Sequence, residues 1–407
     1  MINIGVYTTV AYKQEVTFGV LPAASAAQLI RRRSAKLEFA KATFESPEIR
    51  PDMQVNDFRH GLRSAKGSIQ QDISPKSGSD FFAAVMGRDF AAGVSISAVS
   101  LTMATGSIVN TIQLYTVTRS AGSFLTDGFK IGDVIRLSVG GLNAANINKN
   151  LQITSLTALV ATVRVVNGSA MVAEGPISGC TVSVPGKKTF IPSTAQTNKS
   201  FSIEAWASDI NQSESYTGMK VSKAAVNCPT GGIADVTFDF AGQGMTPAQT
   251  QYFTSPTSAP TFASEASVNG AICVNDAPQT TVTGISFAID RAMTGDAVVG
   301  AFVAPQINPG IFKVTGSMTV LYSDNVLRDL FISETETDLY LVLTCDNTAA
   351  SDFVAFTMPR VKLNSSVKDD KVQNIVQTFA FQALYNNNGG AGVNEELTTI
   401  SIQDTQA

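Results

Sequence analysis

Residues that commonly carry catalysis are sparse in this sequence. Its one histidine, His60, stands in the run Asp57–Gly61. No nucleophile elbow, pair of zinc-binding histidines or Walker loop accompanies it. A lone histidine beside a glycine is typical of a turn or an interface. We therefore expect His60 to have a structural role or a contact role.

Adjacent carboxylates, which could serve in acid–base or metal chemistry, occur at Asp369–Asp370 and Glu395–Glu396. Neighbouring side chains on a strand point to opposite faces, so such pairs do not converge on one bond or ion. We interpret them as solvated loop charge. The pairs Gly231–Gly232 and Gly389–Gly390 lack the spacing and the following helix of a phosphate-binding loop. The sequence thus predicts no enzyme, no cofactor and no metal site.

Composition limits the possible partners. The chain has 407 residues, a net charge of −4, 44% hydrophobic and 15% charged residues. A protein that grips nucleic acid carries clustered basic charge, and the one dense basic run, Arg31–Arg33, is short. That run is interpreted as a solvated turn, with a partner contact as the alternative.

The cysteines and the apolar segments bear on the compartment in which the protein is made. The four cysteines are scattered, which favours reduced thiols over a disulfide scaffold. Neither a signal peptide nor an apolar run of membrane-spanning length is present, so we expect synthesis in a cytoplasm and no membrane partner.

Alternating apolar and polar residues predict a mainly β fold, and the strand pattern occurs twice. Ser34–Phe39 followed by Lys66–Ile69 resembles Gly284–Ile289 followed by Val314–Met318. A short helix is expected after each, in Ser77–Met86 and Ser323–Phe331, because Ser and Asp precede apolar runs there.

Later segments also match between the two halves. Phe201–Ala205 pairs with Leu339–Leu343, Met219–Val221 with Pro359–Val361, and Asp235–Phe240 with Val376–Phe381. The first copy is longer by about 110 residues, the size of a small domain. We therefore expect an inserted all-β domain at 91–197. The predicted domains are residues 1–90 with 198–255, the insertion at 91–197, and residues 256–407, with a linker near Pro256 and Pro260.

One segment of the first copy is dense in charge of both signs, between Thr43 and His60. Two prolines flank its centre, which suits an extended arm that pairs with a neighbouring subunit through complementary charges. An ordinary solvated loop is the alternative. The residues predicted to make inter-ring or inter-subunit contacts are Glu45, Glu48, Arg50, Asp52, Asp57, Arg59 and His60.

The stretch from Ser34 to Arg88, with Gly316–Thr344 and the close from Gln377 to Asp404, resembles the major tail tube proteins of phages with long non-contractile tails. The resemblance implies two tandem copies of a β-sandwich or barrel fold, each with one short flanking α-helix. It also implies a virion protein that polymerises into stacked rings around a channel for DNA. The second arm, Arg291 to Asn308, is weakly polar and departs from the charged version.

Rings in this family commonly hold six copies of the fold, so two copies per chain imply trimers with pseudo-sixfold symmetry, stacked helically. The implied partners are further copies of the chain and the tape measure, tail terminator and distal tail proteins, while DNA passes through the lumen without specific binding. The rival interpretation is a receptor- or carbohydrate-binding β-sandwich protein. For the insertion, surface decoration, stabilisation between rings and weak attachment to host cells stay open.

Overall fold

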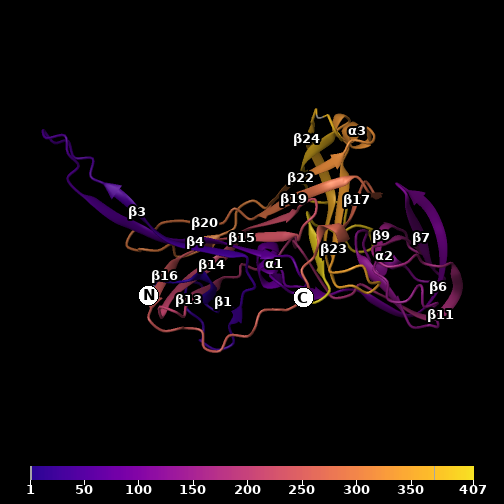
Figure 1. The fold of residues 1–407 in the computed structure, drawn as a ribbon, viewed down its shortest axis with the longest axis horizontal. Coiled ribbons are helices and arrows are strands. Elements are labelled where there is room, and N and C mark those ends of the chain that lie inside the picture. The colour runs from indigo at the N-terminus through magenta and orange to yellow at the C-terminus, as the bar shows by residue number, and fades with distance from the viewer. Residues whose placement is uncertain (1, 371) are drawn as a thin grey trace.

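The computed structural model describes residues 2–370 and 372–407, and strands dominate it, as the alternating sequence predicts. Three short α-helices occur in the described chain: α1 (Ser79–Met86), α2 (Phe124–Asp127) and α3 (Val326–Ile332). In Figure 1 a long hairpin projects at one end, a barrel lies at the other, and the main sheet occupies the space between them.

The first half of the main sheet runs in the order β3–β4–β15–β14–β13–β1, and all of these neighbours are antiparallel. Its strands are β1 (Thr8–Gln14), β3 (Ser34–Glu45), β4 (Phe58–Asp72), β13 (Phe201–Ala207), β14 (Gln212–Cys228) and β15 (Asp235–Gly242). Helix α1 follows β4 in the chain, and the short β2 (Gln28–Leu29) pairs with β1.

The second half runs in the order β19–β22–β25–β24–β23–β17, again antiparallel throughout. Its strands are β17 (Ala271–Val274), β19 (Val282–Asp290), β22 (Lys313–Leu321), β23 (Thr337–Thr344), β24 (Phe353–Lys368) and β25 (Val376–Ala383). Helix α3 follows β22, and β18 (Ala277–Gln279) pairs with β17. Strand for strand, the two halves therefore have the same order of pairing.

Two further strands follow the same scheme. β16 (Gly244–Ala248), after β15, pairs with the first part of β14. β26 (Ser401–Asp404), after β25, pairs with the first part of β24. Both long strands thus have partners on two sides at their beginnings.

The repeated Gly-Ser has the same packing in both halves. Gly67 lies opposite Leu37, and Gly316 lies opposite Phe287. A Cβ on Gly67 would meet the Lys36 carbonyl oxygen at 2.7 Å, and one on Gly316 would meet the Ser286 carbonyl oxygen at 2.5 Å. Since real Cβ atoms do not approach so closely, each position requires glycine.

In the later segments, the observed strand pairing aligns the two halves two residues away from the alignment made from the sequence pattern. β13 has a register irregularity between Phe201 and Ile203, and β23 has one between Thr337 and Leu339. Phe201 therefore corresponds to Thr337, where the sequence pattern had matched it with Leu339. A shift of two leaves the alternation of strand faces unchanged, so the pattern alone could not detect it.

The two halves join along one edge. The second part of β14 pairs antiparallel with β19, from Lys223 opposite Asp290 to Cys228 opposite Ile285. Ile285, Phe287 and Ile289 are at most 3% exposed there. One apolar core, which includes α1 and strands of both halves, continues across the junction. The halves are consequently one packed body.

The predicted insertion contains a closed barrel in the order β10–β7–β6–β11–β8–β9. Its strands are β6 (Ser95–Val109), β7 (Ile112–Arg119), β8 (Val134–Ser138), β9 (Leu151–Leu156), β10 (Val160–Val165) and β11 (Glu174–Ser183). The two flanking strands, β5 (Ala91–Ala92) and β12 (Lys187–Phe190), pair with each other, and β12 pairs with β26 of the main sheet.

The barrel is packed on the second half of the main sheet. Its core cluster includes Tyr340 of β23 and Cys273 of β17. Gln403 of β26 both accepts from the Val134 N–H and donates to the Val134 carbonyl, each at 3.0 Å. Such two-way contacts fix the orientation of the barrel relative to the sheet.

Candidate assembly surfaces

The charged arm is a β-hairpin that projects from the body (Figure 1). Glu45 ends β3, Arg59 and His60 lie near the start of β4, and Glu48, Arg50, Asp52 and Asp57 lie in the connecting segment 46–57. The structure thus brings all seven predicted contact residues together at or near the hairpin tip, and every one of them except the half-buried Arg50 is exposed.

Several of these charges have partners inside the arm. Arg50 Nη2 lies 3.0 Å from Asp52 Oδ2, and Arg59 Nε lies 2.8 Å from Asp57 Oδ2. The hydrogen bond from Arg50 holds the pKa of Asp52 below its ordinary value. Exposed pairs of this kind add little stability. Their contact with a neighbouring subunit stays a prediction.

The arm also exposes apolar side chains, which its charge pattern alone did not predict. Phe44, Ile49, Met53, Val55 and Phe58 are 54% to 98% exposed. Large apolar groups gathered on a projecting hairpin are typical of a surface that another molecule covers. Their alternation with charged residues was the signal that could have revealed them.

The second arm, Arg291 to Asn308, lies along the first one (Figure 1). Its ends pair through β20 (Thr294–Gly295) and β21 (Ile307–Asn308). The backbone N–H of Arg63 donates to the Phe302 carbonyl at 2.7 Å, and the Arg63 guanidinium lies 5.1 Å from the Phe302 ring centroid. The weakly polar segment therefore supports the base of the charged arm.

Two strand edges lack a neighbour in the described chain. β3 pairs with β4 on one side only, and the second part of β24, up to Lys368, pairs only with β25. In the first half, the corresponding part of β14 has β15 on one side and β19 on the other. Unpaired edges of this length are ready to pair with another chain.

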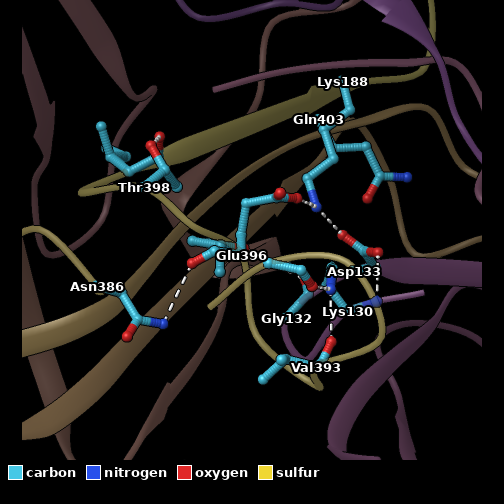
Figure 2. Close-up of polar contacts among 12 residues, drawn as sticks. Lys130, Gly132, Asp133, Lys188, Asn386, Val393, Glu396, Thr398 and Gln403 are labelled. Carbon is cyan, nitrogen blue, oxygen red and sulfur yellow. Dashed lines mark hydrogen bonds and ion pairs between the residues drawn. The ribbon is translucent and has the colours of Figure 1, made fainter. Parts of the chain in front are cut away.

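A buried ionic cluster ties the insertion to the C-terminal loop (Figure 2). Lys188 Nζ lies 2.5 Å from Asp133 Oδ1 and 3.0 Å from Glu396 Oε2, and the three side chains are 13%, 4% and 14% exposed. Lys130 donates to the carbonyl of Val393 at 2.5 Å and also to that of Gly390. Residues from three distant segments meet here, so the interpretation of Glu396 as solvated loop charge is wrong.

The charges in this cluster depend on one another. Burial would raise the pKa of Glu396, but the charge and hydrogen bond of Lys188, together with the charges of Lys130 and Arg88, hold that pKa below its ordinary value. Burial raises the pKa of Asp133 despite Lys188. Burial opposes the charge on Lys188, yet Asp133 and Glu396 raise its pKa overall. Loss of the central cation would leave two buried carboxylates uncompensated.

His60 and the side chains that could bind a metal ion are the remaining candidates for chemistry. The His60 ring packs edge-on against Phe58 at a centroid distance of 5.3 Å, on the exposed arm. Within residues 2–370 and 372–407, no group of three or more His, Cys, Asp and Glu side chains could hold a metal ion. The helices of this described part are each far too short to span a bilayer.

The comparisons with known proteins agree with this architecture. A family model described as "Phage tail tube protein" matches residues 5–383, nearly the whole chain, including the insertion. No curated protein matches the sequence. A match of this extent covers both halves of the main sheet, the arm and both free edges. The chain therefore belongs to the phage tail tube protein family, a family of structural proteins of the phage tail.

Proposed function

We propose that this chain is the repeating subunit of a tail tube and polymerises as stacked rings around a channel through which DNA leaves the virion. The observation that carries the proposal is the edge junction inside the chain. There one half of the main sheet pairs with the other through β14 and β19, while the equivalent edges, β24 and β3, have no described partner.

We further propose that the two halves are tandem copies of one fold and that three chains close a ring with pseudo-sixfold symmetry. The shared strand order, the equivalent glycines and the helix after β4 and β22 support the duplication. Three chains carrying two copies each supply the six units of such a ring. Closed rotation leaves no strand edge unpaired, and stacking of rings gives a tube.

The arm supplies the contact between rings in this proposal. It projects beyond the main sheet and exposes apolar groups, such as Ile49 and Met53, among charges of both signs. Burial of the apolar groups against the next ring provides free energy, and the charges fix register. Other tail proteins, the tape measure within the lumen and the terminator and distal tail proteins at the ends, complete the set of partners.

The channel role requires a wall that does not hold DNA. Each Lys or Arg contact with a phosphate releases counterions and strengthens binding. A net charge of −4 agrees with weak, non-specific passage. No catalytic step is needed in this role, because the tube only guides the DNA.

Electron microscopy of the purified protein tests the proposal. Concentration-dependent growth into hollow tubes, with three chains per ring, is the expected result. A protein that stays monomeric at all concentrations and binds glycans would overturn it in favour of the receptor- or carbohydrate-binding alternative. Six chains per ring would overturn the trimer and leave the tube intact.

A further inference from the structure

We infer that neighbouring chains join by antiparallel pairing of β24 on one chain with β3 on the next, in the register that β14 and β19 adopt within the chain. The inference rests on the proposed function and adds to it the identity of the two edges and the residues that face each other. The occupant of each edge is a second copy of this chain.

The register follows from superposing the pairings of the two halves. In the first half Ala225 of β14 lies opposite Ala288 of β19. Strand β19 corresponds to β3. Ile285 of β19 lies opposite Met318 of β22, and Ala35 of β3 lies opposite Ile69 of β4. Met318 and Ile69 each stand two residues after the repeated glycine, so Ile285 and Ala35 are equivalent. Ala288 thus corresponds to Glu38.

The same comparison places the other strand. Ala224 lies opposite Phe238, and Ser366 lies opposite Phe379, at equivalent positions of β15 and β25. Ala225 therefore corresponds to Val367. Between chains, Val367 should lie opposite Glu38, Ser366 opposite Phe39 and Asp369 opposite Lys36.

Burial at the two edges agrees with a missing neighbour. In β19 the inward side chains Ile285, Phe287 and Ile289 are at most 3% exposed, because β14 continues the sheet beside them. Their equivalents in β3, Ala35, Leu37 and Phe39, are only half-buried. On the opposite edge, Val367 is 63% exposed. A second chain would bring both edges to the state of the internal junction.

The two helices show the same difference. All side chains of α1 from Phe81 to Met86 are buried, and second-half residues help to cover it: Phe356 packs on Phe82, and the buried Arg291 donates to the Ala84 carbonyl at 2.8 Å. In α3, Val326 and Ile332 are 56% and 68% exposed. The first half of the next chain would lie over α3 as the second half lies over α1.

Charge on the outward face fits the same register. Within the chain Lys223 lies opposite Asp290. Between chains the register places Asp369 opposite Lys36, a pair of opposite sign at the positions equivalent to Asn227 and Ser286. Directly opposed charges of opposite sign stabilise a strand pair by about 0.2–1 kcal/mol, and the same pair of like sign would destabilise it.

Disulfide trapping tests the register. The variant Glu38→Cys/Val367→Cys is prepared in a Cys345→Ser background, because the other three cysteines are buried. Tubes are oxidised and dissolved for a non-reducing gel. Directly opposed strand positions lie within the Cα separation that a disulfide needs, so covalent species that stop at three chains are expected.

Two matched variants calibrate the result. Ala225→Cys/Ala288→Cys, the internal equivalent, should bridge within a single chain. Glu38→Cys/Ser366→Cys places the thiols on opposite faces and should not bridge. Tubes that form without any Glu38–Val367 bond, while the internal pair bonds, would overturn the edge pairing and leave the tube role standing. A ladder that passes three chains would overturn closure by three.

If the double-cysteine variant does not assemble, a labelling experiment tests the same edge pairing. Glu38→Cys and Val367→Cys are made singly in the same background, and maleimide labelling is compared between tubes and dispersed subunits. At least tenfold slower labelling in tubes is expected at both positions. Ile108→Cys, on the insertion and 69% exposed as the native side chain, should label equally in both. Equal labelling of the edge thiols would overturn the inference. If the unsubstituted chain forms no tubes, the proposed function itself fails.

Discussion

Replacement of Lys188 by methionine removes the central cation of the buried cluster while keeping most of the side-chain volume. The change leaves Asp133 and Glu396, 4% and 14% exposed, without their cation. Removal of one partner from a buried ion pair costs about 3–5 kcal/mol, because the remaining charge is desolvated and uncompensated. The cluster is the main ionic contact between the insertion and the loop 384–400, so we expect this loop to lose stability.

Hydrogen exchange of the amides in residues 384–400 is the suitable assay, because a chain with several packed parts need not unfold in one step. A loss of 3 kcal/mol corresponds to roughly 100-fold faster exchange through local opening. Lys187→Met, in the same strand but exposed, is the matched control and should leave exchange unchanged. Equal exchange in the two variants, or a change of less than about fivefold in Lys188→Met, would contradict the expected loss of stability.

Acid should reduce the difference between Lys188→Met and the unsubstituted protein. Since the pKa of Glu396 is lowered in the folded chain, its contribution is present above its ordinary pKa and is lost as pH falls through the lowered value. The raised pKa of Lys188 means that its own contribution is complete at neutral pH and is lost only at strongly alkaline pH. Exchange measured at pH 7 and near pH 4 would show whether the deficit narrows as expected.

Three further outcomes are expected. Burial, and then the charge of Asp338, raise the pKa of Asp276 to about 7. The stability that Asp276 contributes is therefore complete below its ordinary pKa and is lost as pH rises through 7. Denaturant midpoints measured from pH 5 to 8 should fall, and Asp276→Asn should flatten this trend. Ile49→Asp, at a side chain 98% exposed, should leave the circular dichroism and thermal midpoint of the subunit unchanged but shorten or abolish tubes in electron micrographs; unchanged tubes would remove the arm from inter-ring contact. Arg291→Ala should lower the free energy of unfolding, measured by urea titration, by about 2–3 kcal/mol, because the Ala84 carbonyl loses the hydrogen bond from the buried guanidinium. A loss below about 0.5 kcal/mol would contradict this.

The sequence predicted the mainly β class and the repeated strand pattern with which each half begins. Its match of Ser34–Phe39 with Gly284–Ile289 agrees residue for residue with the observed register, since Leu37 lies opposite Gly67 as Phe287 lies opposite Gly316. The two helices were placed to within three residues of their observed bounds. The insertion was predicted to be all β, although the bulged register of its strands β6 and β11 interrupts the alternation there.

The contacts between distant segments could not be predicted in this way. Nothing in the spacing of Asp133, Lys188 and Glu396 indicates that they meet, because their meeting depends on how the barrel sits on the second half. The charged residues of the arm were recognisable from composition, whereas the support from Phe302 required the folded path of the second arm. Periodicity reports which face of an element is buried and does not report which element covers it.

Differences between the equivalent edges fit an assembly that must remain soluble before it forms. An exposed strand edge templates aggregation unless charged side chains interrupt it. On β3 the outward positions carry Lys36 and Glu38, where β19 has Ser286 and Ala288. The internal junction is never exposed in the folded chain, so it needs no such protection. If chains meet through β3 and β24 as we infer, Lys36→Ser/Glu38→Ala should raise non-specific aggregation of dispersed subunits, measured by light scattering. Equal scattering from variant and parent at the same concentration would argue that these charges do not protect the edge.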